Sequence, residues 1–139
     1  LNNFPKAKAA TRIIRSDSHT VMQASDAILV ASGTATLEAA LFKRPMVVGY
    51  AMPGLTGILM QKKGIIDFVS LPNILAGERL VPEILQYYCR AETLAYALWH
   101  EYERRNDNEL MDRFTAMHES LLRDTPKLAC DAIASVCGS

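Results

Sequence analysis

The sequence predicts an α/β domain in which a parallel sheet is flanked by helices and followed by a helical C-terminal tail. Two uninterrupted apolar runs, 27–31 and 46–50, have the pattern of strands covered on both faces, as in parallel sheets. Helical spacing of apolar residues separates these runs and dominates the chain from residue 91 onward. We therefore expect a doubly wound, ligand-binding part at residues 1–90 and a helical tail at 91–139 that packs on it.

The elements before residue 90 follow from local patterns. Short apolar segments that end at turn-forming residues predict four strands, at residues 11–15, 27–31, 46–50 and 68–71. Local patterns predict helices at residues 18–24, 34–42 and 80–88, whereas residues 52–63 are mixed, with a turn signal at Pro53 and Gly54 followed by apolar residues at helical spacing. Ser18 is expected to cap the first helix, and Pro82 with Glu83 suits the first turn of the last. Because four strands are few for such a sheet, we expect more strands upstream of Leu1.

In the tail, helices are expected at residues 91–105, 109–123 and 128–136. Asn106 and Glu109 resemble a capping pair at the start of the second helix. Large or apolar side chains of the tail are expected to pack within it, namely Trp99, Tyr102, Cys130 and Cys137.

The composition excludes several functional classes. Fifteen basic residues balance 15 acidic residues, so no net charge attracts nucleic acid. Three cysteines at no metal-ligand spacing favour free thiols in a reducing, cytoplasmic setting. No signal peptide is expected, and the longest uncharged stretch, 45–61, is too short to span a bilayer. No grouping of nucleophile and base or of paired carboxylates is evident, and His100 and His118 are expected to be solvated.

The segment Ser-Gly-Thr-Ala-Thr-Leu-Glu at 32–38 directly follows the first apolar run. A buried strand, a turn of small residues and an immediate helix start together leave free backbone N–H groups at one point, which suits a phosphate or diphosphate. Glu38 lies one turn into the helix, near enough to accept a hydrogen bond from a sugar hydroxyl. Residue types alone also allow a plain tight turn, with Glu38 only stabilising the helix start.

Two amides are further candidates. Asn73 follows the strand expected at 68–71, where ligands bind in open α/β sheets, although a turn residue is the alternative. Gln86 lies on the helix expected at 80–88 and faces either solvent or ligand.

Four segments, in one order, resemble the C-terminal part of the lipid-A-disaccharide synthases. They read Ala-Ser-Gly-Thr-Ala-Thr-Leu-Glu, Pro-Met-Val-Val-Gly-Tyr, Val-Ser-Leu-Pro-Asn-Ile-Leu-Ala-Gly and Pro-Glu-Ile-Leu-Gln, at residues 31–38, 45–50, 69–77 and 82–86. The first is shared with other nucleotide-sugar transferases, and the last two are more distinctive. The resemblance covers nearly the whole chain and is loosest after residue 88. It implies that a Rossmann-like parallel sheet flanked by helices forms part of a GT-B type glycosyltransferase.

The resemblance also implies an activity in lipid A and lipopolysaccharide biosynthesis of Gram-negative bacteria. Such a hexosyltransferase joins UDP-2,3-diacylglucosamine to 2,3-diacylglucosamine 1-phosphate, with inversion, to give lipid A disaccharide 1-phosphate and UDP. The resemblance implies no metal and no cofactor. It implies a cytoplasmic location, peripheral to the inner membrane, with membrane-surface contact and a homodimer as further expectations.

By the same resemblance, the UDP-sugar site comprises Ser32, Gly33, Thr34, Glu38, Tyr50, Asn73 and Gln86. The N–H groups of Gly33 and Thr34 would hold the diphosphate, assisted by the hydroxyl of Ser32 or Thr34. Glu38 would accept from the ribose hydroxyls, and the two amides would contact the nucleotide or its sugar. Tyr50 would face the same cleft.

Two departures limit the resemblance. Ala51 stands where the family usually has a basic residue, which puts a phosphate or lipid contact there in doubt. The family's acceptor site and general base belong to an upstream domain, so we assign no catalytic residue and expect this chain alone to be inactive. For the apolar stretch 55–60, core or subunit packing is favoured over contact with acyl chains or membrane.

Two other functions remain open. One is another UDP-sugar transferase or an epimerase that shares the turn of small residues. The other is a non-catalytic dimerisation module whose helical tail pairs two subunits, by exchange between protomers.

Overall fold

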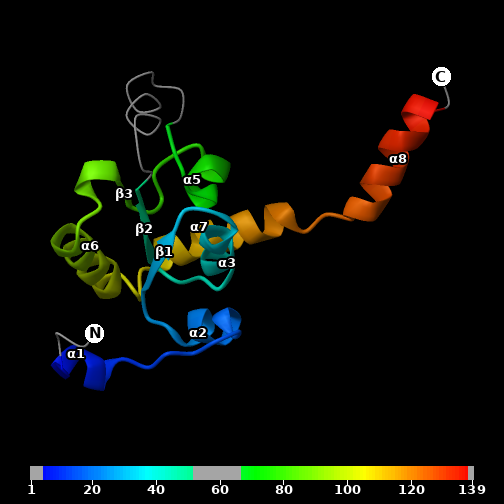
Figure 1. Ribbon diagram of the computed structural model, residues 1–139. Helices are drawn as coiled ribbons and strands as arrows, with labels where there is room; N and C mark the ends of the chain where they lie inside the picture. The colour runs from blue at the N-terminus through cyan, green and yellow to red at the C-terminus, as the bar shows by residue number, and fades with distance from the viewer. Residues whose placement is uncertain (1–4, 52–66, 138–139) are drawn as a thin grey trace.

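The computed structural model describes residues 5–51 and 67–137. Within them, a three-stranded parallel sheet lies at the centre, with its strands in the order β1 (Ile28–Ala31), β2 (Met46–Tyr50) and β3 (Glu83–Leu85). Because all three strands run the same way, their carboxyl ends meet at one edge of the sheet (Figure 1). This confirms the predicted α/β class with a parallel sheet flanked by helices.

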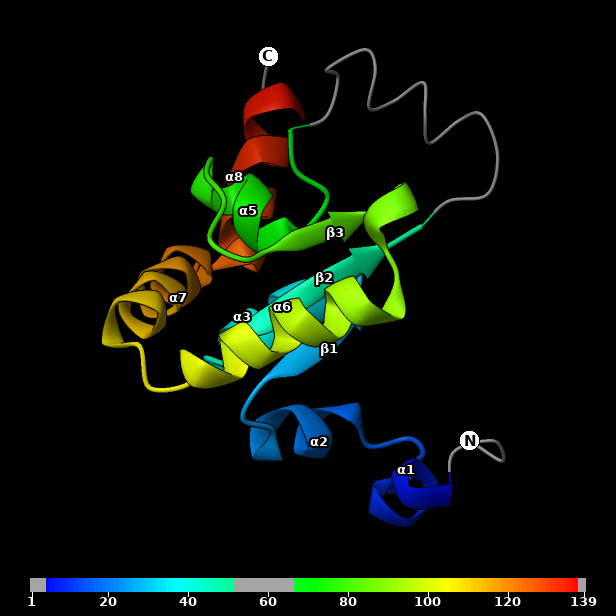
Figure 2. The ribbon, with the colours of Figure 1, turned by 90° about the vertical axis from the view of Figure 1, so that its left-hand side faces the viewer.

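The described helices are α1 (Pro5–Ala10), α2 (Ser18–Ala24), α3 (Thr34–Leu41), α5 (Leu71–Ala76), α6 (Ala91–Glu103), α7 (Asn108–Leu121) and α8 (Thr125–Cys137), with a short 3-10 helix η1 (Gln86–Tyr88). Helix α6 packs on β1 and β2 and crosses in front of them in Figure 2. Helix α3 packs on the same two strands, and it also contacts α5 and α7. Figure 1 shows α6 and α3 on opposite faces of the sheet.

The core lies between the sheet, α3 and α7. Its buried members are Ala39, Ala40, Met46, Val48, Val81, Leu110, Phe114 and Met117. Strand β2 is central in the sheet, and Met46, Val47 and Val48 have no exposed surface. Strand β1 is at the edge of the described sheet, and there Leu29 is 48% exposed. Helices α3 and α6 contact this strand from both faces, but the face that carries Leu29 is only partly covered by the described residues.

Three predicted elements are wrong. Residues 11–15 form no strand, and the side chain of Ile13 is exposed. Residues 68–71 also form no strand, because the N–H groups of Val69 and Ser70 bond to a side chain instead of a neighbouring strand. The predicted helix 80–88 is instead β3 followed by η1, because Glu83–Leu85 pairs with β2. The described chain thus has three strands where four were predicted.

The helix caps also differ from prediction. Asp17, and not Ser18, accepts the N–H of Thr20 at the start of α2. Asp107, and not Asn106, accepts the N–H groups at the start of α7. In each case the capping carboxylate is the residue immediately before the first helical residue, as N-cap geometry requires.

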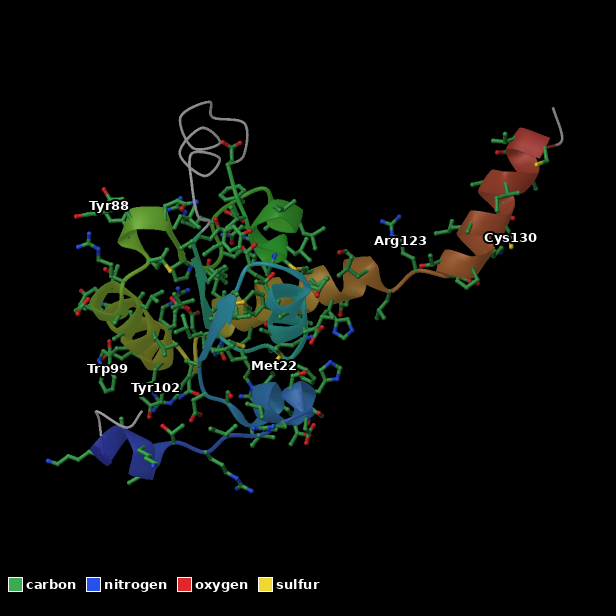
Figure 3. All side chains as sticks on the ribbon, in the orientation of Figure 1. Met22, Tyr88, Trp99, Tyr102, Arg123 and Cys130 are labelled. Carbon is green, nitrogen blue, oxygen red and sulfur yellow. The ribbon has the colours of Figure 1, made fainter. Side chains whose placement is uncertain are left out.

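The last helix lies apart from the rest. Helices α6 and α7 form as predicted and pack on the sheet and on α3, whereas no residue of α8 is buried by the described part of the chain. Figure 3 shows Cys130 on this projecting helix and Trp99 on the outer side of α6. Cys130 and Cys137 are exposed, so their predicted packing is wrong for the described residues. Trp99 is 60% exposed, but its ring contacts that of Tyr102 on the same helix, with 5.5 Å between centroids. The mixed segment 52–63, with its helical spacing, and the apolar stretch 55–60 lie outside the described residues.

Candidate functional site

The turn between β1 and α3 is built around one glycine. Gly33 is the N-cap of α3, with φ 135° and ψ −165°, a region of backbone space that is open only to glycine. Among the described residues, no side chain caps the helix, and apart from the chain neighbours of Gly33 no heavy atom lies within 4 Å of where its Cβ would be. The start of α3 therefore presents its N-terminal N–H groups and the helix dipole beside an open space, as an anion-binding turn requires.

Two hydroxyl groups of the turn and of α3 hold this turn in place by hydrogen bonds. The hydroxyl of Ser32 donates a 2.7 Å hydrogen bond to the carbonyl of Val69. The buried hydroxyl of Thr36 donates to the carbonyl of Gly33 at 2.7 Å and accepts from the N–H of Leu71 at 3.2 Å. A hydroxyl has one proton to donate, so in this structure Ser32 gives its proton to the protein. Thr34 is exposed at the turn and remains the better placed hydroxyl for a ligand.

Glu38 lies one turn into α3, as predicted, and its side chain is 38% exposed. Its Oε2 atom is 3.2 Å from Nε2 of His19, which lies on α2. The ring of His19 also meets the ring of Phe42 edge-on, with 5.6 Å between centroids. Sequence reasoning missed His19 as a partner of Glu38, because no motif links the two positions.

Tyr50 and Gln86 lie at the ends of the neighbouring strands. Tyr50 is the last residue of β2, and Gln86 directly follows β3. In the parallel ladder, Ala31 is opposite Gly49 and Tyr50 is opposite Leu85. The structure thus brings the turn at Gly33, Tyr50 and Gln86 to one edge of the sheet, where ligands bind in open α/β folds. Ala51, which follows Tyr50, is exposed and supplies no charge there.

Asn73 has a different place from the one predicted. It lies inside α5 rather than after a strand, and it has no exposed surface. Its Oδ1 accepts from the N–H groups of Leu80 and Val81, and its Nδ2 donates to Val81 and to Glu83. Because the amide is buried and bonded on both sides, a direct ligand contact by Asn73 is not available in this structure. The side chain instead shapes the loop between α5 and β3.

The other polar groups of the described residues can also be compared with the predictions made for them. Within the described ranges, no three His, Cys, Asp or Glu side chains gather as metal ligands. His118, which we expected to be solvated, is half-buried, and its Nδ1 is 2.7 Å from the ammonium group of Lys43. His100 is exposed, as predicted, and contacts the hydroxyl of Tyr96. Of the helices in the described part, none combines the length and the apolar character needed to cross a membrane.

Comparison with known proteins places the chain in a family. A family profile described as "Lipid-A-disaccharide synthetase" matches residues 4–133. The lipid-A-disaccharide synthase of Verminephrobacter eiseniae is 48% identical over 130 residues, which are 90% of this chain and 33% of that protein. The synthase of Albidiferax ferrireducens is 48% identical over 134 residues, 93% and 34% of the two chains. The synthase of Aliivibrio salmonicida is 46% identical over 121 residues, which are 87% of this chain and 31% of that protein.

The chain spans about a third of the length of these curated relatives. The match nevertheless covers nearly all of the chain itself, including the turn at Gly33 and the strand ends beside it. The chain belongs to the lipid-A-disaccharide synthase family.

Proposed function

We propose that this chain is the donor-binding C-terminal part of a hexosyltransferase of lipid A biosynthesis. The complete protein would join UDP-2,3-diacylglucosamine to 2,3-diacylglucosamine 1-phosphate and release UDP. Family membership supports this reaction, and residues 1–90, which contain the turn, would hold the nucleotide sugar. The observation that carries the proposal is the uncapped start of α3 at Gly33, which opens at the carboxyl ends of the strands.

The proposed mechanism at this site is electrostatic. The N–H groups at Gly33 and Thr34, at the start of α3, would hold the diphosphate of the donor. As the bond to the anomeric carbon breaks, negative charge grows on the departing UDP, and fixed N–H dipoles stabilise that charge without reorganising. Glu38 would accept hydrogen bonds from the ribose hydroxyls. Tyr50 and Gln86 would border the same ligand from the two neighbouring strand ends.

The other half of the reaction is assigned to the part of the protein outside this chain. Inversion requires a base that takes the proton of the acceptor hydroxyl as it attacks the anomeric carbon. No residue of this chain is given that role. We also propose that the complete protein works in the cytoplasm at the inner membrane surface, because both proposed substrates carry acyl chains.

Kinetics of the complete protein test the donor site. We expect Glu38→Ala to raise the donor KM about tenfold, because an ionised acceptor of the ribose hydroxyls is lost, and to leave the acceptor KM unchanged. Glu119→Ala, which removes an exposed carboxylate from α7, is the matched control and keeps both constants. Wild-type donor kinetics in the Glu38 variant would remove that residue from the site.

Substrate choice separates the proposed reaction from its nearest alternative. The complete protein should transfer from UDP-2,3-diacylglucosamine and not from UDP-N-acetylglucosamine. Equal transfer from the donor without the long acyl chains would instead favour a general UDP-sugar transferase.

We further propose that α8 pairs two copies of the protein. The helix leaves the described body, and its apolar side chains Leu128, Ile133 and Val136 are exposed. A second copy that received this helix would cover these side chains.

A further inference from the structure

The backbone of residues 69–71 is held between the turn at Gly33 and one carboxylate. On one side, Val69 accepts the hydroxyl proton of Ser32, and Leu71 donates to the hydroxyl of Thr36. Ser32 and Thr36 flank Gly33, and Thr36 also bonds to the Gly33 carbonyl. The position of segment 69–71 therefore fixes the turn from both of its ends.

On the other side, Glu83 holds the same segment. Its Oε1 accepts the N–H of Ser70 at 2.9 Å and the hydroxyl of Ser70 at 2.6 Å. The N–H of Val69 lies 3.2 Å from Oε1 and 3.1 Å from Oε2. Nδ2 of Asn73 completes the set at 2.9 Å from Oε1. Every partner among the described residues is a donor, and an ionised carboxylate, which only accepts, matches such a set.

Glu83 is itself fixed by the sheet. It is the first residue of β3, and it pairs with Val48 of the central strand, whose side chain has no exposed surface. A path of hydrogen bonds therefore runs from the paired strand β3, through the Glu83 carboxylate and Val69, to Ser32 in the turn. Strands position such groups more precisely than loops do.

We propose that Glu83 is a positioning residue for the diphosphate-binding turn. Its carboxylate sets the place of segment 69–71, and that segment sets the direction of the N–H groups at Gly33. The inference rests on the proposed function, because it assumes that the turn binds the UDP part of the donor. Asn73 and Ser70 take part by orienting the carboxylate. This gives Asn73, which has no exposed surface, an indirect role in donor binding.

The decisive variant is Glu83→Gln in the complete protein. Its amide oxygen can keep the Oε1 contacts, but an NH₂ group then faces the N–H of Val69, the residue that holds Ser32. We expect the Kd of UDP, measured by calorimetry per folded protein, to rise about tenfold, because bonds to a charged acceptor are lost. The donor KM should rise in parallel, while the acceptor KM stays at its wild-type value.

Glu78→Gln is the matched control. It makes the same chemical change in the loop between α5 and β3, at an exposed carboxylate that pairs with Arg113. This variant should keep the wild-type Kd of UDP. A purely structural role for Glu83 would lower the yield of folded protein without changing the Kd of the folded fraction.

A double-mutant cycle tests the path itself. Ser32→Ala and Glu83→Gln act through the same Val69, so their effects on the Kd should be less than additive. If Glu83→Gln does not fold, Ser70→Ala removes one contact to the Glu83 carboxylate, that of the hydroxyl, keeps the backbone N–H contact and should still weaken UDP binding. The inference is overturned if Glu83→Gln, or Ser70→Ala in its place, binds UDP within about twofold of wild type, or if the cycle is additive. The proposed function itself fails if Gly33→Val leaves UDP binding unchanged.

Discussion

His19 and Glu38 join α2 to α3 through a contact of 3.2 Å between Nε2 of the imidazole and Oε2 of the carboxylate. The ring of His19 is held in turn by an edge-on contact with Phe42. An imidazole bonded to one carboxylate oxygen leaves the other oxygen for a ligand. His19 therefore directs the group that we assign to the ribose hydroxyls.

Replacing His19 tests whether this residue orients the carboxylate of Glu38. We expect His19→Ala to raise the donor KM about threefold with no change in kcat, because a partly exposed contact of this kind contributes under about 1 kcal/mol. The effect should be smaller than that of Glu38→Ala, which removes the acceptor itself. His100→Ala, at an exposed histidine on α6, is the control. An unchanged donor KM, or a loss confined to kcat, would show that His19 does not orient Glu38.

Gly33→Ala tests the backbone of the turn. Beyond its chain neighbours, the new methyl group would meet no atom of the described residues within 4 Å, so the expected cost is that of φ 135° and ψ −165°, which a Cβ disfavours by about 1–3 kcal/mol. We expect weaker UDP binding and a lower Tm. Gly77, at φ 68° and ψ 12°, is the comparison, because asparagine tolerates that left-handed region. Gly77→Asn should keep the Tm and Gly33→Asn should not; equal behaviour of the two would contradict the backbone argument.

The sequence predicts the parts of this fold that local pattern decides. The apolar runs of β1 and β2 and the helices α3, α6 and α7 follow from periodicity, and the turn at Gly33 follows from its small residues. Strand β3 does not, because Glu83–Leu85 carries helix-forming residues and is a strand only by pairing with β2. A pairing of this kind is a tertiary effect that local propensity does not contain.

The candidate site, too, could be predicted from the sequence only where local pattern decides the structure. Gly33 and Glu38 lie within one motif, and their arrangement is readable from spacing alone. The buried place of Asn73 and the role of Glu83 depend on bonds between α5, its flanking loops and β3. Such bonds join positions that share no periodicity. Sequence reasoning accordingly located the turn but not the side chains that support it.

Glu101 predicts one pH dependence of stability. It is buried on α6, its Oε1 accepts from Arg104, and its Oε2 has no hydrogen-bond partner within the described residues. Burial raises the pKa of Glu101 above 4.5, although Arg104 opposes the shift. A raised pKa gives stability that is present below 4.5 and is lost as the pH rises through the folded-state pKa. The wild type should therefore lose Tm relative to Glu101→Gln as the pH rises from about 4.5 toward neutral pH. A constant difference across that range would contradict the assignment.

Asp107, the N-cap of α7, should give a pH dependence of stability with the opposite sign. The N–H of Leu110 and then the guanidinium of Arg104 lower its pKa below 3.8. A lowered pKa gives stability that is present above 3.8 and is lost as the pH falls through the folded-state pKa. Asp107→Asn keeps a capping oxygen but removes the charge. Its Tm deficit relative to wild type should be present at neutral pH and vanish in acid, and a deficit that persists in acid would exclude the charge as its cause.

The exposed side of α8 gives the last prediction. Ile133 is 64% exposed and Val136 is 77% exposed, on a helix with no buried residue in the described part of the chain. If a second copy covers them, burial of one such side chain contributes about 1.5–3 kcal/mol, so a charge there weakens the dimer by at least about tenfold. We expect light scattering to give a dimer mass for the complete protein and a monomer mass for Ile133→Asp. Lys127→Asp, at an exposed polar position of the same helix, should remain a dimer. A monomeric wild type, or a dimer that survives Ile133→Asp, would show that α8 does not pair two copies.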